Sequence, residues 1–131
     1  GYLWNLNGLA TYFFSLYCSD AFQQKYEIVR KKYIWNTLMF INELESIEHI
    51  RIIPSRANFV LLKMGNLSSD TLMITLLKDF GIYVRDCSDK IGLGPGYVRV
   101  ASRSFEENQL IYAALSEIGK EYSKTKISNK K

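Results

Sequence analysis

Two short segments decide the fold, Gly81-Ile82-Tyr83-Val84-Arg85-Asp86 and Tyr97-Val98-Arg99-Val100-Ala101. Side chains on a β-strand alternate between its two faces, so the valines of both segments share one face and the arginines share the other. If the valines point into a core, Arg85 and Arg99 project together from the opposite face of one small sheet. The polar, glycine-rich stretch 86–96 between the segments predicts a connecting loop.

Outward from these strands, the sequence predicts four helices and two further strands. Helices are expected over 8–17, over 19–46, over 70–80 and from 104 onward, and strands over 50–53, 58–64, 82–85 and 97–101. Only residues 55–57 follow Pro54 before the second strand, which is too short for a crossover helix, so the first two strands cannot be parallel neighbours. We therefore expect an α+β fold: a two-layer small domain with a mostly antiparallel sheet covered by helices, preceded by a long N-terminal helix.

Three helix ends carry local signals. Asn7 is a preferred residue type for the N-cap of the first helix. Gly81 follows the helix over 70–80 at the point where a left-handed residue is needed. Ser104 and Glu107 have the spacing of a capping box, in which each side chain accepts a hydrogen bond from the other residue's backbone amide.

The charge of the chain is concentrated at its C-terminal end. The formal net charge is +4, and residues 120–131, with five lysines and one glutamate, account for all of it. A basic terminus is usually solvated and frayed, so we expect a basic, disordered tail over 120–131. The alternative for this tail is nucleic-acid binding, which would be sensitive to salt and would disappear when 120–131 are deleted.

Composition and cysteine usage are typical of a cytoplasmic globular domain. The 131 residues, of which 47% are hydrophobic, can bury one core. No run of about 18 apolar residues could span a membrane, and the apolar start lacks the basic region of a signal peptide. Cys18 and Cys87 lie far apart without metal-ligand spacing, which indicates buried or idle thiols.

Candidate catalytic groups are few. His49 is the only histidine, so no second histidine can share a metal, and no Ser-His-Asp relay can be argued without an elbow motif. Gly92, Gly94 and Gly96 form a G-x-G-x-G run. A phosphate-binding loop would open a helix, whereas this run leads into the strand at Tyr97 and predicts a flexible turn. We expect no catalytic, cofactor-binding or metal-binding residue in the chain.

The two arginines are the informative feature. Neighbouring guanidinium groups repel each other unless an anion joins them, and the arginine fork can hold a carboxylate or phosphate through two parallel hydrogen bonds. The alternative is that Asp86, Asp89 or Glu106 neutralises each arginine. The spacing leaves both interpretations open.

Five motifs along the chain form one pattern. They are Trp4-Asn5-Leu6-Asn7 with Ala10, Pro54-Ser55-Arg56-Ala57-Asn58-Phe59-Val60-Leu61, Gly81-Ile82-Tyr83-Val84-Arg85-Asp86, Gly92-Leu93-Gly94 with Tyr97-Val98-Arg99-Val100-Ala101, and Glu106-Glu107-Asn108. In this order they resemble the C-terminal small domain of fold-type I pyridoxal-phosphate aminotransferases, most of all the branch that holds histidinol-phosphate aminotransferase and threonine-phosphate decarboxylase. The resemblance covers nearly the whole chain.

The resemblance implies a reaction and two substrate contacts. In this family the arginine of the last strand grips the substrate α-carboxylate, which gives that role to Arg99. In the phosphate-substrate branch, the arginine of the Gly-Ile-x-x-Arg-Asp segment helps to bind a distal phosphate, which gives that role to Arg85. The reaction would transfer an amino group between an amino acid, phosphorylated or not, and a 2-oxo acid, with pyridoxal 5'-phosphate as the cofactor.

The resemblance also implies what lies outside the chain. The family's Schiff-base lysine, pyridinium-pairing aspartate and phosphate cup lie upstream, and no lysine of this chain matches that motif. Residues 1–18 would then be a lead-in helix from the missing N-terminal PLP-binding domain, and 19–119 would be the small domain. We expect the chain to be inactive alone and to act within a homodimeric full-length enzyme, without nucleic acid or membrane. Similar domains also occur fused to nucleotidyltransferases.

A different class of function stays open. The chain could be a stand-alone, non-catalytic α+β module that binds an anionic amino-acid ligand with Arg85 and Arg99. A natural start close to residue 1 would favour the module, whereas an upstream reading frame with a Ser-x-x-Lys segment would favour the enzyme.

Overall fold

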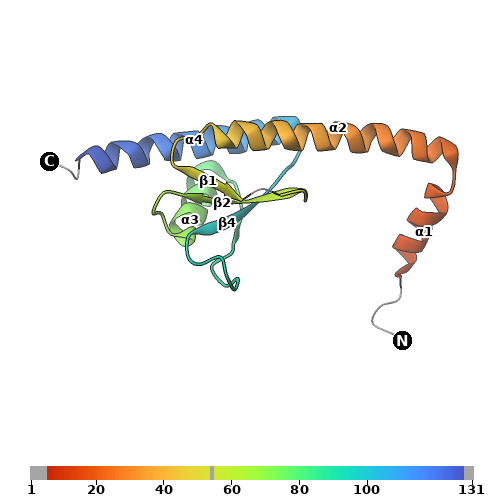
Figure 1. The fold of residues 1–131 in the computed structure, drawn as a ribbon, viewed down its shortest axis with the longest axis horizontal. Helices are drawn as coiled ribbons and strands as arrows, with labels where there is room; N and C mark the ends of the chain where they lie inside the picture. Colours follow the sequence, from red (N-terminus) through yellow and green to blue (C-terminus); the bar gives the residue numbers. More distant parts are fainter. Residues whose placement is uncertain (1–5, 54, 129–131) are drawn as a thin grey trace. The chain divides into compact units, whose positions relative to one another are not determined.

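The computed structural model describes residues 6–53 and 55–128, with side chains described up to residue 124. The elements in chain order are α1 (Gly8–Tyr17), α2 (Asp20–Glu45), β1 (Ile50–Ile53), β2 (Phe59–Met64), α3 (Ser69–Phe80), β3 (Arg85–Asp86), β4 (Tyr97–Ala101) and α4 (Phe105–Ser128) (Figure 1). This order confirms the expected α+β fold. Contacts divide the chain into two compact units, Gly1–Trp35 and Asn36–Lys131.

The four strands form one sheet in the order β1-β2-β4-β3, and every neighbouring pair is antiparallel. Ile53 of β1 is opposite Leu61 of β2, so the chain turns back directly between these strands. This confirms that the first two strands are not parallel neighbours. β4 lies between β2 and β3, which places Arg99 opposite Leu61 on one side and opposite Arg85 on the other.

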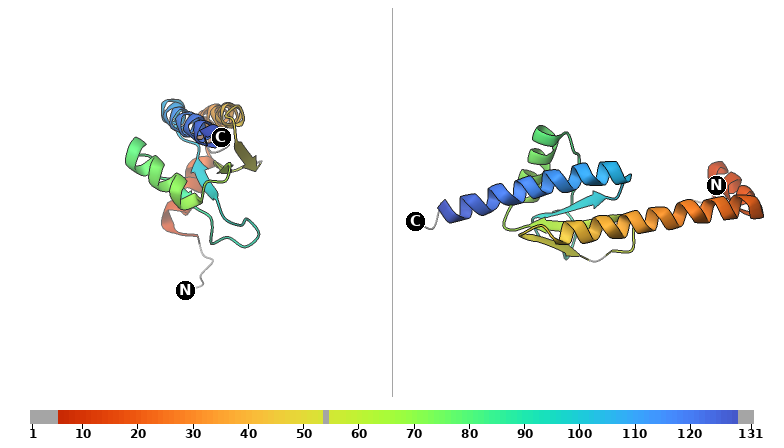
Figure 2. Two further views of the ribbon diagram at one scale, coloured as in Figure 1. Left: turned by 90° about the vertical axis from the view of Figure 1, so that its left-hand side faces the viewer. Right: turned by 90° about the horizontal axis from the view of Figure 1, so that it is seen from above.

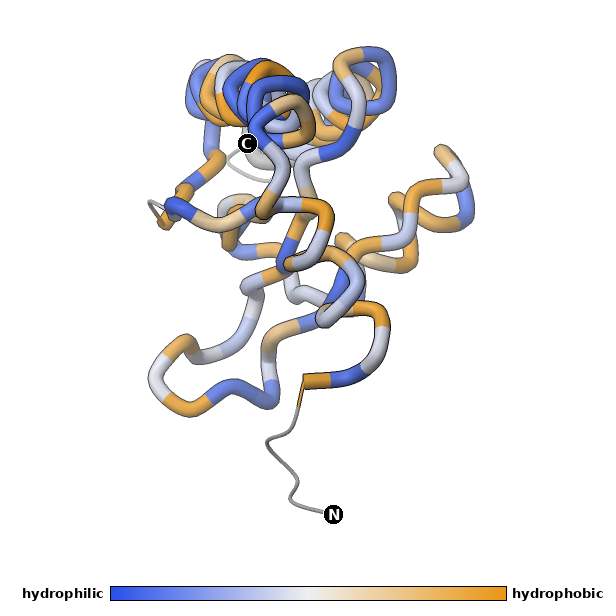
Figure 3. The backbone as a smooth tube through the Cα atoms, turned by 90° about the vertical axis from the view of Figure 1, so that its right-hand side faces the viewer, coloured by the Kyte–Doolittle hydropathy of each residue, from blue (hydrophilic) through white to orange (hydrophobic). Residues whose placement is uncertain are grey.

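Helices cover one face of this sheet. Residues 36–45 of α2, together with α3 and α4, share a single hydrophobic core with the inward side chains of the strands. In both figures α4 runs beside this part of α2 (Figures 1 and 2). Hydrophilic and hydrophobic residues are mixed along the helices (Figure 3). The most completely buried apolar side chains are Phe40, Leu44, Val60, Leu62, Met64, Leu72, Leu76, Val98, Val100 and Leu115.

The first unit is built around aromatic side chains. Asn7 caps α1 as its sequence predicts, because its side chain accepts a hydrogen bond from the Ala10 amide at 2.8 Å. The ring centroid of Phe13 lies 5.7 to 6.0 Å from those of Phe14, Tyr17, Phe22 and Tyr26. These edge-on and stacked rings hold α1 against the first turns of α2.

The strand expected over 82–85 is wrong in its extent, because only Arg85 and Asp86 pair with β4. Gly81 ends α3 in the left-handed conformation, with φ 67°, and confirms its expected role. The amides of Gly81 and Ile82 donate to carbonyl groups in the last turn of α3, at 3.2 and 2.9 Å. The start of segment 82–85 is therefore hydrogen-bonded to the end of α3, and pairing with β4 begins only at Arg85.

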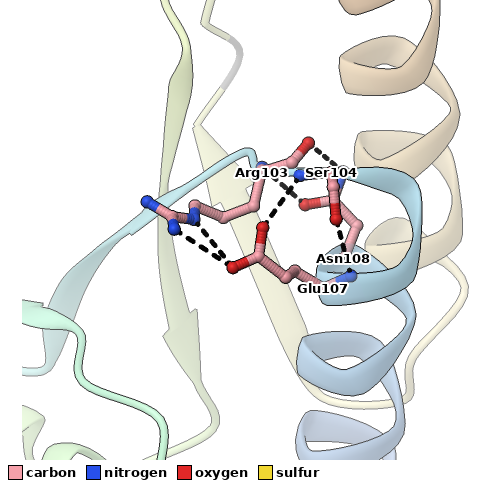
Figure 4. Close-up of polar contacts among 4 residues, drawn as sticks. All are labelled: Arg103, Ser104, Glu107 and Asn108. Carbon is pink, nitrogen blue, oxygen red and sulfur yellow. Dashed lines mark hydrogen bonds and ion pairs between the residues drawn. The ribbon is translucent and has the colours of Figure 1, made fainter.

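A polar network holds the turn from β4 into α4 (Figure 4). Ser104 and Glu107 form the expected capping box, each side chain accepting from the other residue's amide at 3.2 Å. Asn108 is buried and accepts from the Arg103 amide at 2.7 Å. Its amide group also donates to the Ser102 hydroxyl at 3.3 Å, and that hydroxyl accepts from Thr37 of α2 at 2.9 Å.

The helix that follows this turn is longer than the sequence suggests. α4 continues to Ser128, so the backbone of 120–128 is helical, although the sequence predicts a frayed tail from 120. The last three residues of that tail lie outside the described residues. Within the described ranges, no helix is long and apolar enough to cross a membrane.

We predict that Asn108→Ala lowers the free energy of unfolding by about 1–3 kcal/mol, because it removes the hydrogen bonds of the buried Asn108 side chain with the Arg103 amide and with the buried Ser102 hydroxyl. The midpoint of urea denaturation, followed by circular dichroism, measures this loss. Asn66→Ala, at an exposed position after β2, is the matched control and should move the midpoint far less. Equal midpoints for the two variants would show that the network contributes little.

Candidate anion-binding site

The structure brings the two predicted arginines together. Arg85 of β3 and Arg99 of β4 are direct cross-strand partners, and the valines beside them, Val84, Val98 and Val100, are buried. The alternation expected from the sequence is therefore confirmed, and both arginines lie on the sheet face turned away from the helices. Arg85 is exposed and Arg99 is half-buried.

Asp86 and Asp89, two of the three carboxylates that could neutralise these arginines, have other partners. Asp86 accepts from the Ser88 hydroxyl at 2.6 Å and from the Ser88 amide at 2.9 Å. Asp89 is paired with the neighbouring Lys90. None of the ion pairs found between described residues involves Arg85 or Arg99. The geometry thus favours the interpretation in which the two guanidinium groups receive an anion from outside the chain.

The pKa values of Asp86 and Asp89 are both lowered, mainly by partners other than Arg85 and Arg99. Hydrogen bonds from the Ser88 and Ser69 hydroxyls lower the pKa of Asp86 to about 2. The pKa of Asp89 is lowered chiefly by its hydrogen bond from Lys90, and the field of Arg85 contributes less. Asp86 is therefore firmly ionised and is held by serines at the start of α3 and in the loop after β3, on the far side of the strand from Arg85.

Arg99 leans across the sheet away from Arg85. Its guanidinium carbon lies 4.9 Å from the ring centroid of Phe59 on β2. Phe59 is opposite Ala101, so it is the diagonal neighbour of Arg99 across the β2–β4 pair, a position that long side chains reach. A cation over the face of an aromatic ring is attracted by the ring quadrupole.

Among the described strand residues, the rest of this face carries two more cations and no carboxylate. The outer face, as we name it, consists of the strand residues turned away from the helices: Arg51, Ile53, Phe59, Leu61, Lys63, Arg85, Tyr97, Arg99 and Ala101. Lys63 donates to the Pro95 carbonyl at 3.2 Å and lies over the Tyr97 ring. It thereby ties the glycine-rich loop to β2.

Besides Arg85 and Arg99, the outer face carries two further cations and an aromatic ring that the sequence did not indicate as site residues. Arg51, Phe59 and Lys63 all occupy outward positions of strands whose inward residues are apolar. The alternation in Phe59-Val60-Leu61-Leu62-Lys63 is the signal that could have found two of them. Their place on the same face as Arg99 depends on the strand order, which the sequence does not contain.

Among the described residues, the cavity beside the end of β4 offers no lysine for a pyridoxal phosphate. A cavity of about 640 Å³ lies between the end of α3, segment 82–84, the end of β4 and α4, and neither a lysine nor Arg85 nor Arg99 lines it. Gly96 is held close to the Leu67 carbonyl with φ 91°, in a turn that leads into β4 and not into a helix, so it forms no phosphate loop. In the described part of the chain, no group of three or more metal-ligating side chains comes together.

Comparisons with known proteins find relatives that match most of the chain. The chain is 42% identical over 123 residues to the L-serine phosphate decarboxylase of Campylobacter jejuni, covering 92% of this chain and 31% of that protein. It is 38% identical over 80 residues to the histidinol-phosphate aminotransferase of Methanocaldococcus jannaschii, covering 61% of this chain and 21% of that enzyme. No protein-family model matches the chain.

A solved structure is also similar. A decarboxylase from Sulfurospirillum multivorans superposes with a TM-score of 0.81 and 41% identity, over 90% of this chain and 34% of that one. The chain thus spans about a third of the length of these two decarboxylases.

We predict that the stability of the fold depends on the charge of Asp86. The folded-state pKa, about 2, lies below the unfolded value of about 3.9, so the carboxylate stabilises the fold above about pH 4. This contribution is lost as the pH falls towards 2. Denaturation midpoints of the chain and of Asp86→Asn, measured from pH 7 to pH 2, should differ at neutral pH and converge in acid.

The exposed Asp79→Asn serves as the control and should keep the pH dependence of the unsubstituted chain. A constant difference between the chain and Asp86→Asn across this pH range would mean that the serines bind the neutral side chain equally well.

Proposed function

We propose a function from this premise: the chain belongs to the fold-type I pyridoxal-phosphate enzymes, as the C-terminal small domain of larger proteins. In the longer polypeptide, it supplies the arginine clamp for an amino acid that carries a phosphate. Arg99 holds the α-carboxylate and Arg85 holds the distal phosphate. The observation that carries the proposal is the direct pairing of Arg85 with Arg99 on the outer face, with no carboxylate paired to either among the described residues.

The chemistry of the two positions supports this division. Arg99 is half-buried and leans over Phe59, so its donors meet a small anion in partly desolvated surroundings, where a charged hydrogen bond is stronger. Arg85 is exposed at the edge strand, which leaves room for a larger dianion. Two fixed cations would orient the ligand as well as bind it, and a fixed orientation lowers the entropic barrier to reaction.

The cofactor would be held by the rest of the polypeptide. Pyridoxal phosphate supplies an electron sink for reactions at the substrate α-carbon, and the cavity beside the end of β4 offers it no lysine. We accordingly propose that the chain has no activity alone and that the complete enzyme is a cytoplasmic homodimer. The chain's own contribution is to bind the substrate, orient its α-carbon and compensate its negative charges.

Two reactions fit this clamp, and the names of the relatives bear on the choice. Amino transfer to a 2-oxo acid is the activity that the motif pattern implies. Decarboxylation is favoured by the greater identity to an L-serine phosphate decarboxylase, 42% over 123 residues, than to a histidinol-phosphate aminotransferase, 38% over 80 residues. Both reactions begin with the same anionic ligand at the same two arginines.

We predict that the 131-residue chain binds O-phospho-L-serine more tightly than L-serine. Arg99→Ala should weaken O-phospho-L-serine binding at least about tenfold, because hydrogen bonds to charged groups contribute about 1.5–3 kcal/mol and about 1.4 kcal/mol is tenfold in Kd. Arg85→Ala should weaken O-phospho-L-serine selectively and leave L-serine unchanged. NMR titration of the arginine side-chain signals measures both.

Arg30→Ala is the matched control, because Arg30 is paired with Glu27 on α2 and should leave both affinities unchanged. Equal affinity for the two amino acids, or an equal loss in all three variants, would remove the clamp from the proposal.

For the longer polypeptide we predict that Arg99→Ala lowers kcat/KM by about 30-fold to several-thousand-fold, as expected when a charge pair worth about 2–5 kcal/mol is broken. Incubation with O-phospho-L-serine distinguishes the reactions by their products. Release of carbon dioxide without an oxo acid indicates decarboxylation, whereas consumption of an added 2-oxo acid indicates amino transfer. If neither product forms and the cofactor absorbance is missing, the stand-alone binding module becomes the better explanation.

A further inference from the structure

Phe59 occupies a special place on the outer face. It is the first residue of β2, half-buried, and its ring lies under the guanidinium of Arg99 at 4.9 Å. Its direct partner on β4 is Ala101, the smallest side chain on the outer face. A larger residue at 101 would compete with Arg99 for the space beside this ring.

Two forces on Arg99 act in the same direction. Arg85 is directly opposite Arg99 on β3, and like charges at such positions repel. On the other side of β4, the Phe59 ring attracts the guanidinium. Leu61, the direct partner of Arg99 on β2, carries no charge that could hold it. The ring is therefore the group that fixes the direction in which Arg99 leans.

We infer that Phe59 is a positioning residue, which holds the Arg99 guanidinium over β2 and thereby separates two anion subsites on the outer face. Arg99 and Arg85 then bind two different anionic groups of one ligand and do not share a single anion. This inference rests on the proposed function for the ligand, but the direction of Arg99 is a property of the unliganded chain.

The first test therefore uses no ligand. In NMR spectra of the 131-residue chain, the Arg99 side-chain protons should be shifted upfield by the Phe59 ring current. The shift should disappear in Phe59→Leu and persist in Phe59→Tyr. Phe105→Leu makes the same substitution at an exposed position that begins α4, and it should leave the Arg99 signals unchanged. An Arg99 without ring-current shift in the unsubstituted chain would overturn the inference, whether or not Phe59→Leu folds.

The second test adds O-phospho-L-serine. Phe59→Leu should weaken its binding about two- to fivefold, the effect of losing one exposed cation–π contact, and Phe59→Tyr should restore it. Inorganic phosphate should shift the Arg85 signals at lower concentrations than the Arg99 signals in the unsubstituted chain. Identical phosphate titration curves for the two arginines, or unchanged O-phospho-L-serine binding in Phe59→Leu, would overturn the separation of the subsites.

The two tests distinguish a failure of the proposed function from a failure of the positioning role of Phe59. If the unsubstituted chain does not bind O-phospho-L-serine, the proposed function fails, while the ring-current shift still decides whether Phe59 holds Arg99. If the ligand binds but Phe59→Leu and Phe105→Leu behave alike in both tests, the proposed function stands and the positioning role of Phe59 is overturned.

Discussion

The antiparallel register between β3 and β4 is the constraint on which the rest of the site depends. It sets two guanidinium groups opposite each other, at positions where like charges destabilise a sheet. The valines on the other face, at 98 and 100, are buried completely or almost so. A slip by one residue would bring Arg99 into that core, and the cost of an unpaired buried charge excludes it. Core packing therefore enforces an arrangement that electrostatics alone would disfavour.

β4 keeps its register despite the repulsion between Arg85 and Arg99, because contacts with several other elements fix it. It lies between β2 and β3, and beyond its end the buried side chains of Ser102 and Asn108 connect it to α4 and to Thr37 of α2. Buried polar groups that satisfy one another favour a single arrangement, because any other leaves a donor or acceptor unpaired. The strand that presents Arg99 is thus fixed by apolar packing along its length and by hydrogen bonds after its end.

The helix caps and the shared face of the two arginines could be predicted from the sequence, whereas features that depend on contacts between distant segments could not. Asn7, Gly81 and the pair Ser104 and Glu107 act through neighbours within four residues, so their capping roles follow from local spacing. Alternation alone placed Arg85 and Arg99 on one face. The short extent of β3 and the contact of Phe59 with Arg99 depend on which distant segments meet, and no local pattern contains that information.

The brevity of β3 has a consequence for the behaviour of the chain in solution. An edge strand offers unpaired backbone groups on which another chain can build, and long, flat edges promote aggregation. β3 pairs over only two residues and carries the exposed Arg85, while segment 82–84 forms no strand pairs with β4. At the β3 edge, a strand of another molecule would find almost no regular backbone to pair with, and it would lie beside the positive charge of Arg85. The feature that prepares the outer face for an anion also protects this edge of the sheet, although not the β1 edge, from pairing with another copy.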